Sequence, residues 1–265
     1  MSKKVSVICN IYHPNQGCFK RFLDACLSQT LSDVEFIFTL DSPTDIESRS
    51  TLKEYQSKFE ASKNTFIFIE NEKNLGIDAC YINALDKTTG KYVFNPDDDD
   101  FFDNELLEKA YNYLEEQKVE CVKIHVICGY INNTLLYEME RDTQTFIYTR
   151  EYAFRNLDIL ASCFGTFYKL ECIDLPVEFG VFYYYVRNDE GTALRTESGN
   201  LDNWDLSNND KQTAEKDHKR YYCEMYKDQG ITQDMSLSEM HEILYNCKDI
   251  MVYNKGLSYE FLKGL

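Results

Sequence analysis

The segment that decides the fold is YVFNPDDDDFF, residues 92–102. Its apolar start predicts the end of a buried strand, and four aspartates, Asp97 to Asp100, follow in one turn. Carboxylates this close together repel each other unless water, protonation or a cation relieves the repulsion. The turn is therefore either a site for a hard divalent cation or a solvated acidic loop, since charge runs are usually exposed.

The sequence before this segment alternates between strand and helix patterns. Apolar, β-branched runs predict strands at residues 5–11, 34–40, 66–69 and 91–95. Two apolar stripes and one polar stretch predict helices between them, at residues 19–27, 46–63 and 76–90. This alternation predicts an α/β fold, with a Rossmann-like, mostly parallel sheet that helices cover on both faces.

Three polar clusters directly follow predicted strands. Tyr12-His13 follow the first strand, Asp41 follows the second, and the aspartate run follows the fourth. In open α/β sheets, ligands bind beyond the carboxyl ends of the strands. We therefore expect the three clusters to converge on one crevice.

The alternation breaks down beyond residue 132, where the pattern becomes mixed α+β. The sequence predicts a helix capped by Asn104, a strand over 119–131 interrupted at Gly129, and candidate strands at 160–170 and 179–186. The aromatic run within the last of these is interpreted as packing rather than as a sugar platform. We expect one compact domain in three parts: residues 1–131, a mixed α+β half at 132–210 and a helical C-terminal extension at 211–265.

The composition restricts the class of partner. A formal net charge of -17 disfavours nucleic acid and anionic membranes, which both need clustered Lys and Arg. The 10 cysteines include no Cys-x-x-Cys pair, which fits reduced thiols. The start leads straight into the first strand without a signal peptide, and no apolar run reaches about 18 residues. We expect a cytoplasmic protein without a transmembrane segment.

Several blocks in this order resemble the inverting family-2 glycosyltransferases of the GT-A fold, including the spore-coat nucleotide-sugar transferases. One Asp-x-Asp would be a weak signal, whereas an ordered series across residues 4–107 is specific. The blocks are residues 5–12, 27–30, 40–45, 74–76, 90–93 and 97–100. The resemblance implies a nucleoside-diphosphate sugar donor, most often linked to UDP, and Mn²⁺ or Mg²⁺ as the cofactor. Residues 1–131 would bind this donor, and residues 132–210 would bind the acceptor.

The resemblance also implies roles at the base side of the donor. Tyr12 would stack on the base, Asn10 would lie beside it, and Asp41 would accept a hydrogen bond from the base edge. The residues alone leave other interpretations open, because Tyr12 could cap a strand and Asp41 could be an Asx-turn residue. Two positions depart from the family pattern. Leu40 replaces an Asp, and residues 80–82 replace Ala-Arg-Asn, so a nucleotide-contacting arginine is absent.

The aspartate run matches the metal motif of the family. Asp97 matches the first aspartate, which reaches the ribose side, and Asp99 matches the metal-binding aspartate. Asp98 and Asp100 would support them around the nucleotide. A run of four leaves the register open by one residue, so Asp97 is also a candidate metal ligand.

An inverting transfer needs a general base that takes the proton of the acceptor. The resemblance implies an acid in the second half, and residues 188–195 match that region best. Asp189 is the predicted base and Glu190 its rival, although Asp189 could instead be a helix N-cap. Ser162 and Cys163 fall where the family places acceptor-site residues.

The predicted function is metal-dependent, inverting transfer of a sugar to a hydroxyl of a glycan or small acceptor. One alternative is a non-catalytic nucleotide-sugar or glycan-binding module, favoured if Asp189 and Glu190 lie remote from the crevice. Another is a nucleotidyltransferase, which normally has a Gly-rich, basic first loop. Residues 12–15, Tyr-His-Pro-Asn, do not supply such a loop.

Overall fold

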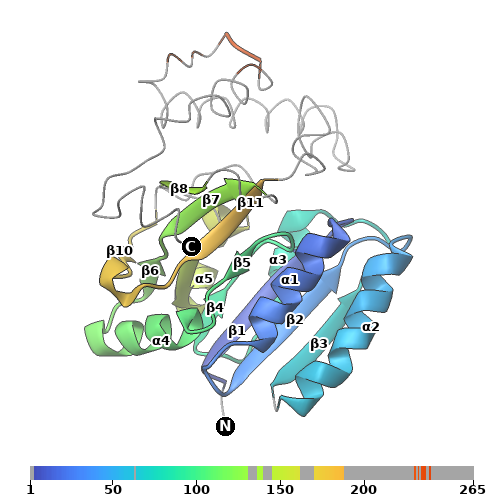
Figure 1. Cartoon of the computed structure of the whole chain (residues 1–265), viewed down its shortest axis with the longest axis horizontal. Helices are drawn as coiled ribbons and strands as arrows, with labels where there is room; N and C mark the ends of the chain where they lie inside the picture. Colours follow the sequence, from blue (N-terminus) through green and yellow to red (C-terminus); the bar gives the residue numbers. More distant parts are fainter. Residues whose placement is uncertain are drawn as a thin grey trace.

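The computed structural model describes residues 3–62, 64–130, 136–139, 145–161 and 170–187, together with 230, 232, 234–236 and 239. Two sheets form its centre, and helices cover both faces of the larger one (Figure 1). Of the three predicted parts of the chain, the structure therefore describes most of the first, portions of the second and a few residues of the third.

The large sheet has seven strands in the order β10-β6-β9-β4-β1-β2-β3. Strands β1 to β4 pair in parallel, and β9 is antiparallel to both of its neighbours. The sheet is thus mixed but mostly parallel in its first half, as the strand–helix alternation predicts. Its strands are β1 Val5–Ile11, β2 Val34–Leu40, β3 Thr65–Glu70, β4 Tyr92–Phe94, β6 Cys121–Lys123, β9 Phe146–Thr149 and β10 Ile173–Asp174.

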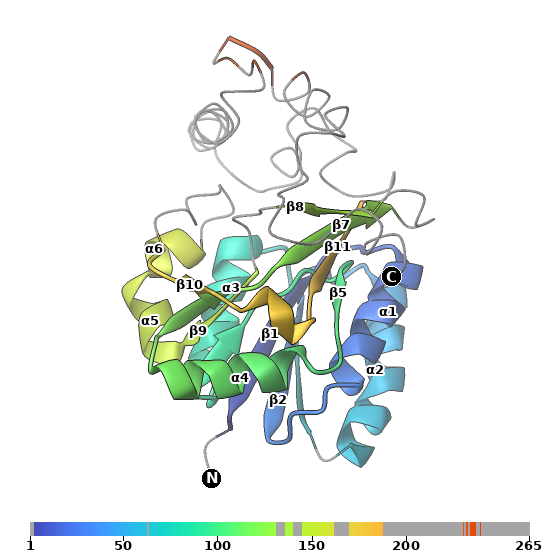
Figure 2. The same cartoon turned by 60° about the vertical axis from the view of Figure 1, so that its left-hand side comes forward.

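Helices cover both faces of this sheet because its strands carry apolar side chains on both faces. Helices α1 (Gln16–Leu27), α2 (Ile46–Ala61) and α4 (Leu106–Gln117) pack on the face that contains Val7 and Phe36. Helices α3 (Ile77–Lys87), α5 (Arg150–Arg155) and α6 (Leu157–Leu160) pack on the face that contains Ile8 and Ile37. Figure 2 shows α1 and α2 to the right of β1 and β2, and α5 and α6 on the left.

The small sheet has four strands in the order β5-β11-β7-β8. Strand β11 is parallel to β7 and antiparallel to β5, and β7 is antiparallel to β8. Figures 1 and 2 both show this sheet at the end of the large sheet toward which β1 points. Its strands are β5 Phe101–Phe102, β7 Val126–Tyr130, β8 Leu136–Met139 and β11 Tyr183–Arg187.

The second half differs from the sequence prediction in several places. The strand predicted over 119–131 is two strands, because β6 pairs with β9 in the large sheet while β7 pairs with β11 in the small one. The strand predicted at 160–170 was wrong at its start, where α6 ends, and residues 162–169 lie outside the described part. The strand predicted at 179–186 begins only at Tyr183, because the 3-10 helix η2 (Val177–Phe179) and Gly180 at φ 61 precede it. Helix α4 has no side-chain N-cap, so Asn104 is not its cap.

Within the described residues, no helix is both long enough and apolar enough to cross a membrane.

Candidate functional site

The aspartate run begins where β4 ends, and three hydrogen bonds fix it in the fold. The backbone N–H of Asp97 donates to the Tyr183 hydroxyl at 3.0 Å. An oxygen of Asp98 accepts from the Tyr12 N–H at 3.1 Å, and one of Asp100 accepts from the Val186 N–H at 2.7 Å. Asp100 is buried and the other three are half-buried. The run is therefore an integral part of the fold and not a solvated loop.

Negative charge is concentrated at this turn. Removal from water, followed by repulsion from Asp99 and Asp97, raises the pKa of Asp98 well above its ordinary value, and the Tyr12 N–H only partly opposes this. The pKa of the buried Cys9 thiol is also raised, first by burial and then by Asp98. A cation at this position would relieve the repulsion between the carboxylates.

The donor atoms of the run fit Mn²⁺ or Mg²⁺. No three Asp, Glu, His or Cys side chains gather around one ion position in the part of the chain that the structure describes. Mg²⁺ is commonly held by one or two carboxylates together with substrate phosphates, so a complete protein cage is not required. Oxygens of Asp98 and Asp100 accept hydrogen bonds from backbone N–H groups. The ligand roles of Asp97 and Asp99 rest on the family resemblance and stay predictions.

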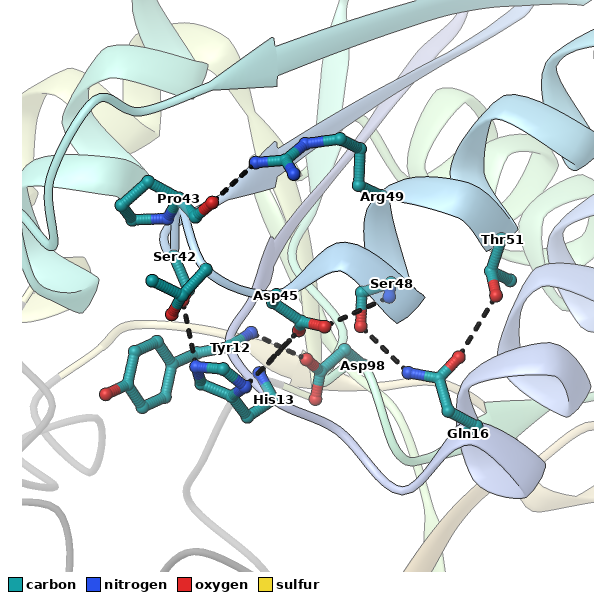
Figure 3. Close-up of polar contacts among 11 residues, drawn as sticks. Tyr12, His13, Gln16, Ser42, Pro43, Asp45, Ser48, Arg49, Thr51 and Asp98 are labelled. Carbon is teal, nitrogen blue, oxygen red and sulfur yellow. Dashed lines mark hydrogen bonds and ion pairs between the residues drawn. The ribbon is translucent and has the colours of Figure 1, made fainter.

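Tyr12 and His13 connect the aspartate run to the turn after β2 (Figure 3). The Tyr12 N–H binds Asp98, and the His13 N–H donates to an Oδ2 of Asp45 at 3.2 Å. The His13 Nε2 lies 2.8 Å from the Ser42 hydroxyl. Asp45 also caps α2 by accepting from the Ser48 N–H at 3.0 Å. The ends of β1, β2 and β4 therefore meet at one edge of the sheet, as the sequence predicts.

Asp41 is buried and anchors the loop that leads into α3. One of its oxygens accepts from the Asn71 side-chain amide and from the Leu75 N–H, both at 2.8 Å. The other oxygen accepts from the Gly76 N–H at 2.9 Å. Nearby, the Asn10 amide donates to the Ile77 carbonyl at 3.1 Å, which joins the end of β1 to the start of α3. Asn10 and Asp41, two of the predicted base-side residues, thus lie at the entry to α3, and their contacts with a nucleotide stay predictions.

The position of the missing family arginine is occupied by packed side chains. Tyr81 is buried, and its hydroxyl lies 2.9 Å from that of Tyr148. Cys80 lies beside the Asp41 loop, where it accepts a contact of 3.2 Å from the Asn71 amide. Burial, then the Asp41 carboxylate, raises the pKa of the Cys80 thiol. This part of α3 therefore packs against the loop that Asp41 anchors, and residues 80–82 contain no positively charged side chain.

Other predicted residues lie outside the described part of the chain. Asp189 and Glu190, the candidates for the general base, are among them, as are Ser162 and Cys163. The sequence analysis overlooked Tyr183, whose hydroxyl accepts from the Asp97 N–H and also bonds with Asp100. Alternation in the aromatic run could have placed Tyr183 and Tyr185 on one face, but no local pattern reveals a partner 86 residues away.

Comparison with solved structures defines the class of fold. S. aureus TarS (residues 1–349) in complex with UDP-GlcNAc superposes with a TM-score of 0.60 at 15% identity, covering 91% of this chain and 79% of that chain. The mannosyltransferase PcManGT from Pyrobaculum calidifontis, in complex with GDP-Man and Mn²⁺, gives 0.53 at 12% identity, covering 94% and 71%. At these identities the likeness establishes the fold, which is that of the GT-A glycosyltransferases.

The sequence comparisons establish the family. The model for glycosyl transferase family 2 matches residues 6–170, so the chain belongs to that family. An uncharacterized glycosyltransferase of Methanocaldococcus jannaschii is 30% identical over 156 residues, which is 57% of this chain and 51% of the relative. The cholesterol galactosyltransferase of Borreliella burgdorferi is 33% identical over 109 residues, which is 41% of this chain and 28% of the relative. The match thus spans about half or less of the length of these relatives.

Proposed function

We propose that this protein is a metal-dependent, inverting glycosyltransferase that takes a sugar from a nucleoside-diphosphate donor, with a UDP-sugar as the donor that the family resemblance implies. The observation that carries this proposal is the hydrogen bond between the Tyr12 N–H and Asp98. It joins the residue expected to stack on the base to the carboxylates expected to face the diphosphate. A donor that lies across this edge would contact both groups at once.

The donor side of the proposal assigns a role to each residue at the edge. Tyr12 stacks on the base, and Asn10 and Asp41 form the base side of the site together with the loop that Asp41 anchors. Asp97 would face the ribose and, with Asp99, would hold the metal ion. When bound, Mn²⁺ or Mg²⁺ would supply positive charge beside the diphosphate as its bond to the sugar breaks.

Asp98 has a different task because its oxygen already accepts from Tyr12. Through this hydrogen bond, Asp98 fixes the distance between Tyr12, which would stack on the base, and the candidate metal ligands Asp97 and Asp99. Asp100 fixes the run against the small sheet through the Val186 N–H. Preorganised groups of this kind lose little conformational freedom when the donor binds.

The acceptor side rests on the family resemblance. Asp189 would act as the general base, with Glu190 as the rival, and would take the proton from an attacking hydroxyl of a glycan or small acceptor. We also propose a cytoplasmic location, supported by six described cysteines that are all free thiols. The net charge of -17 supports a protein that does not bind nucleic acid.

Thermal unfolding in the presence of nucleoside diphosphates tests the donor site. We expect UDP with Mn²⁺ to stabilise the protein by about 2.7 kcal/mol at 100 times its dissociation constant. A panel of nucleotide sugars then identifies the donor by metal-stimulated release of the nucleoside diphosphate.

The variant Asp99→Asn should lose the metal-dependent part of both signals, because an amide is a weaker ligand for a hard cation. Asp86→Asn, an exposed change on α3, is the matched control and should behave like the natural protein. If no nucleoside diphosphate stabilises the protein and no nucleotide sugar turns over faster with metal, the proposed function is wrong.

A further inference from the structure

His13 adopts a backbone conformation that its surroundings maintain. Its φ of 49° lies in the left-handed region, which few residues other than glycine adopt, although His is enriched there. The N–H donates to Asp45 and the imidazole Nε2 contacts the Ser42 hydroxyl, so backbone and side chain are both attached to the turn after β2. The imidazole Nδ1 also lies 3.7 Å from the Asp45 Oδ2, so the ring has contacts with both Ser42 and Asp45.

The imidazole in turn packs against Tyr12. The two ring centroids lie 4.9 Å apart with an angle of 83° between the ring planes, an edge-to-face contact. Figure 3 shows the phenol ring of Tyr12 extending past His13 and away from Asp45. Because the Tyr12 N–H is bound to Asp98 on the other side, the backbone and the ring of Tyr12 are fixed by two different strand ends.

We propose that His13 is a positioning residue, which holds the Tyr12 ring as a platform for the nucleobase and ties it to Ser42. This inference rests on the proposed function, because it requires a nucleotide at this edge. An aromatic platform that is already fixed loses less side-chain entropy on binding than a mobile one. His13 therefore contributes to binding of the base and not to binding of the diphosphate with its metal ion.

A double-mutant cycle on nucleotide affinity tests the coupling between the two rings. Tyr12→Ala and His13→Ala should each weaken UDP binding in Mn²⁺ about tenfold, since base–aromatic stacking contributes on this scale. The double variant should be no weaker than Tyr12→Ala, because His13 acts through Tyr12. Affinity for Mn²⁺-pyrophosphate, which lacks a base, should stay within about twofold for all three variants.

Two further variants separate the ring from the backbone. His13→Asn tolerates the left-handed conformation but lacks the ring, so it should weaken UDP binding as much as His13→Ala. Lys118→Ala changes another left-handed residue, at φ 55 beyond α4, and should leave UDP affinity unchanged. An unchanged affinity in His13→Ala, or losses that multiply in the double variant, would overturn the inference.

The possible failures are distinguishable. If the natural protein binds no nucleotide, the proposed function and the platform are both overturned. If Tyr12→Ala weakens UDP binding but His13→Ala does not, the donor site stands and only the positioning role is overturned. If His13→Ala weakens UDP and pyrophosphate equally, His13 has a general structural role and the inference is again overturned.

Discussion

Asp41 shows how one buried side chain can determine the shape of a loop. Its carboxylate accepts hydrogen bonds from Asn71, Leu75 and Gly76, which lie 30 to 35 positions further along the chain. We expect Asp41→Ala to destabilise the protein by about 3 kcal/mol, because buried donors would lose their acceptor. Urea unfolding measures this loss.

Asp41→Asn refines the same test. The amide keeps one acceptor oxygen but places an NH₂ group opposite backbone N–H donors, so the loss should fall between that of Asp41→Ala and zero. Asp86→Ala, an exposed change within α3, should leave the unfolding midpoint nearly unchanged. A midpoint for Asp41→Ala equal to that of the natural protein would contradict the anchoring role.

The sequence placed Asp41 at the end of a strand, and the structure agrees. The sequence could not reveal the set of donors, because they come from a loop that two elements, α2 and β3, separate from Asp41. The same limit applies to Tyr12, whose position follows from the first strand but whose hydrogen bond to Asp98 depends on the pairing of β1 with β4.

The carboxylate of Asp103, directly after β5, forms hydrogen bonds with residues in and next to β11 and so links the two halves of the chain. Asp103 accepts from the Phe182 N–H at 2.7 Å and from the Tyr184 hydroxyl at 3.2 Å. Next to it, the rings of Phe101 and Tyr184 stack with centroids 4.5 Å apart. The pKa of Asp103 is raised because loss of water outweighs these hydrogen bonds. The contribution of the contact between β5 and β11 to the stability of the protein should therefore depend on pH.

The sign follows from proton linkage. The folded state holds the proton of Asp103 more tightly than the unfolded chain, whose carboxyl has a pKa of about 3.9. The contribution of Asp103 to stability is therefore present at low pH and is lost as the pH rises through the raised pKa. Asp103→Asn retains an acceptor for Phe182 without the charge, so we expect its urea midpoint to fall less between pH 4 and pH 7.

Asp86→Asn is again the control for this measurement, because its carboxylate is exposed on α3 and its removal should leave the pH dependence of the natural protein. An Asp103→Asn variant with the same pH dependence as Asp86→Asn would show that burial of Asp103 does not govern the response.

At the level of elements, the sequence predicted the first four strands and three helices because each has its own periodic pattern. It failed where the chain changes sheets. Residues 119–131 have one continuous strand-like pattern, yet Cys121–Lys123 pairs with β9 and Val126–Tyr130 pairs with β11. The break at Ile124 and His125 depends on partners: Ile124 donates to the Thr145 carbonyl, and His125 accepts from Tyr183. A local pattern contains no information about these partners.

Across the whole molecule, the two ends of the strands in the large sheet serve different purposes. The candidate site lies at the carboxyl ends of these strands, and the buried carboxylate of Glu35 joins the chain segments at their amino ends. This group accepts from the Ser6 hydroxyl at 2.5 Å, from the N–H and hydroxyl of Thr89 at 2.5 and 2.9 Å, and from the Gly90 N–H at 3.1 Å. A side chain at Gly90 would place its Cβ 2.6 Å from the Ser6 nitrogen. Close packing against Ser6 therefore explains the glycine at the start of residues 90–93, one of the blocks that resemble the family.

This division predicts that stability and nucleotide binding can be changed separately. Glu35→Ala leaves the buried Ser6 hydroxyl and both donors of Thr89 without their acceptor, whereas the Gly90 N–H still donates to the Ser6 hydroxyl oxygen at 2.9 Å. We expect a loss of about 3 kcal/mol in the free energy of unfolding. UDP affinity, measured by calorimetry where the variant is folded, should stay within about twofold, because distant sites act independently. Glu35→Gln retains one acceptor oxygen and should lose less stability. A large loss of UDP affinity in folded Glu35→Gln would show that the two ends of the strands are coupled, whereas Tyr12→Ala should change binding and leave stability nearly intact.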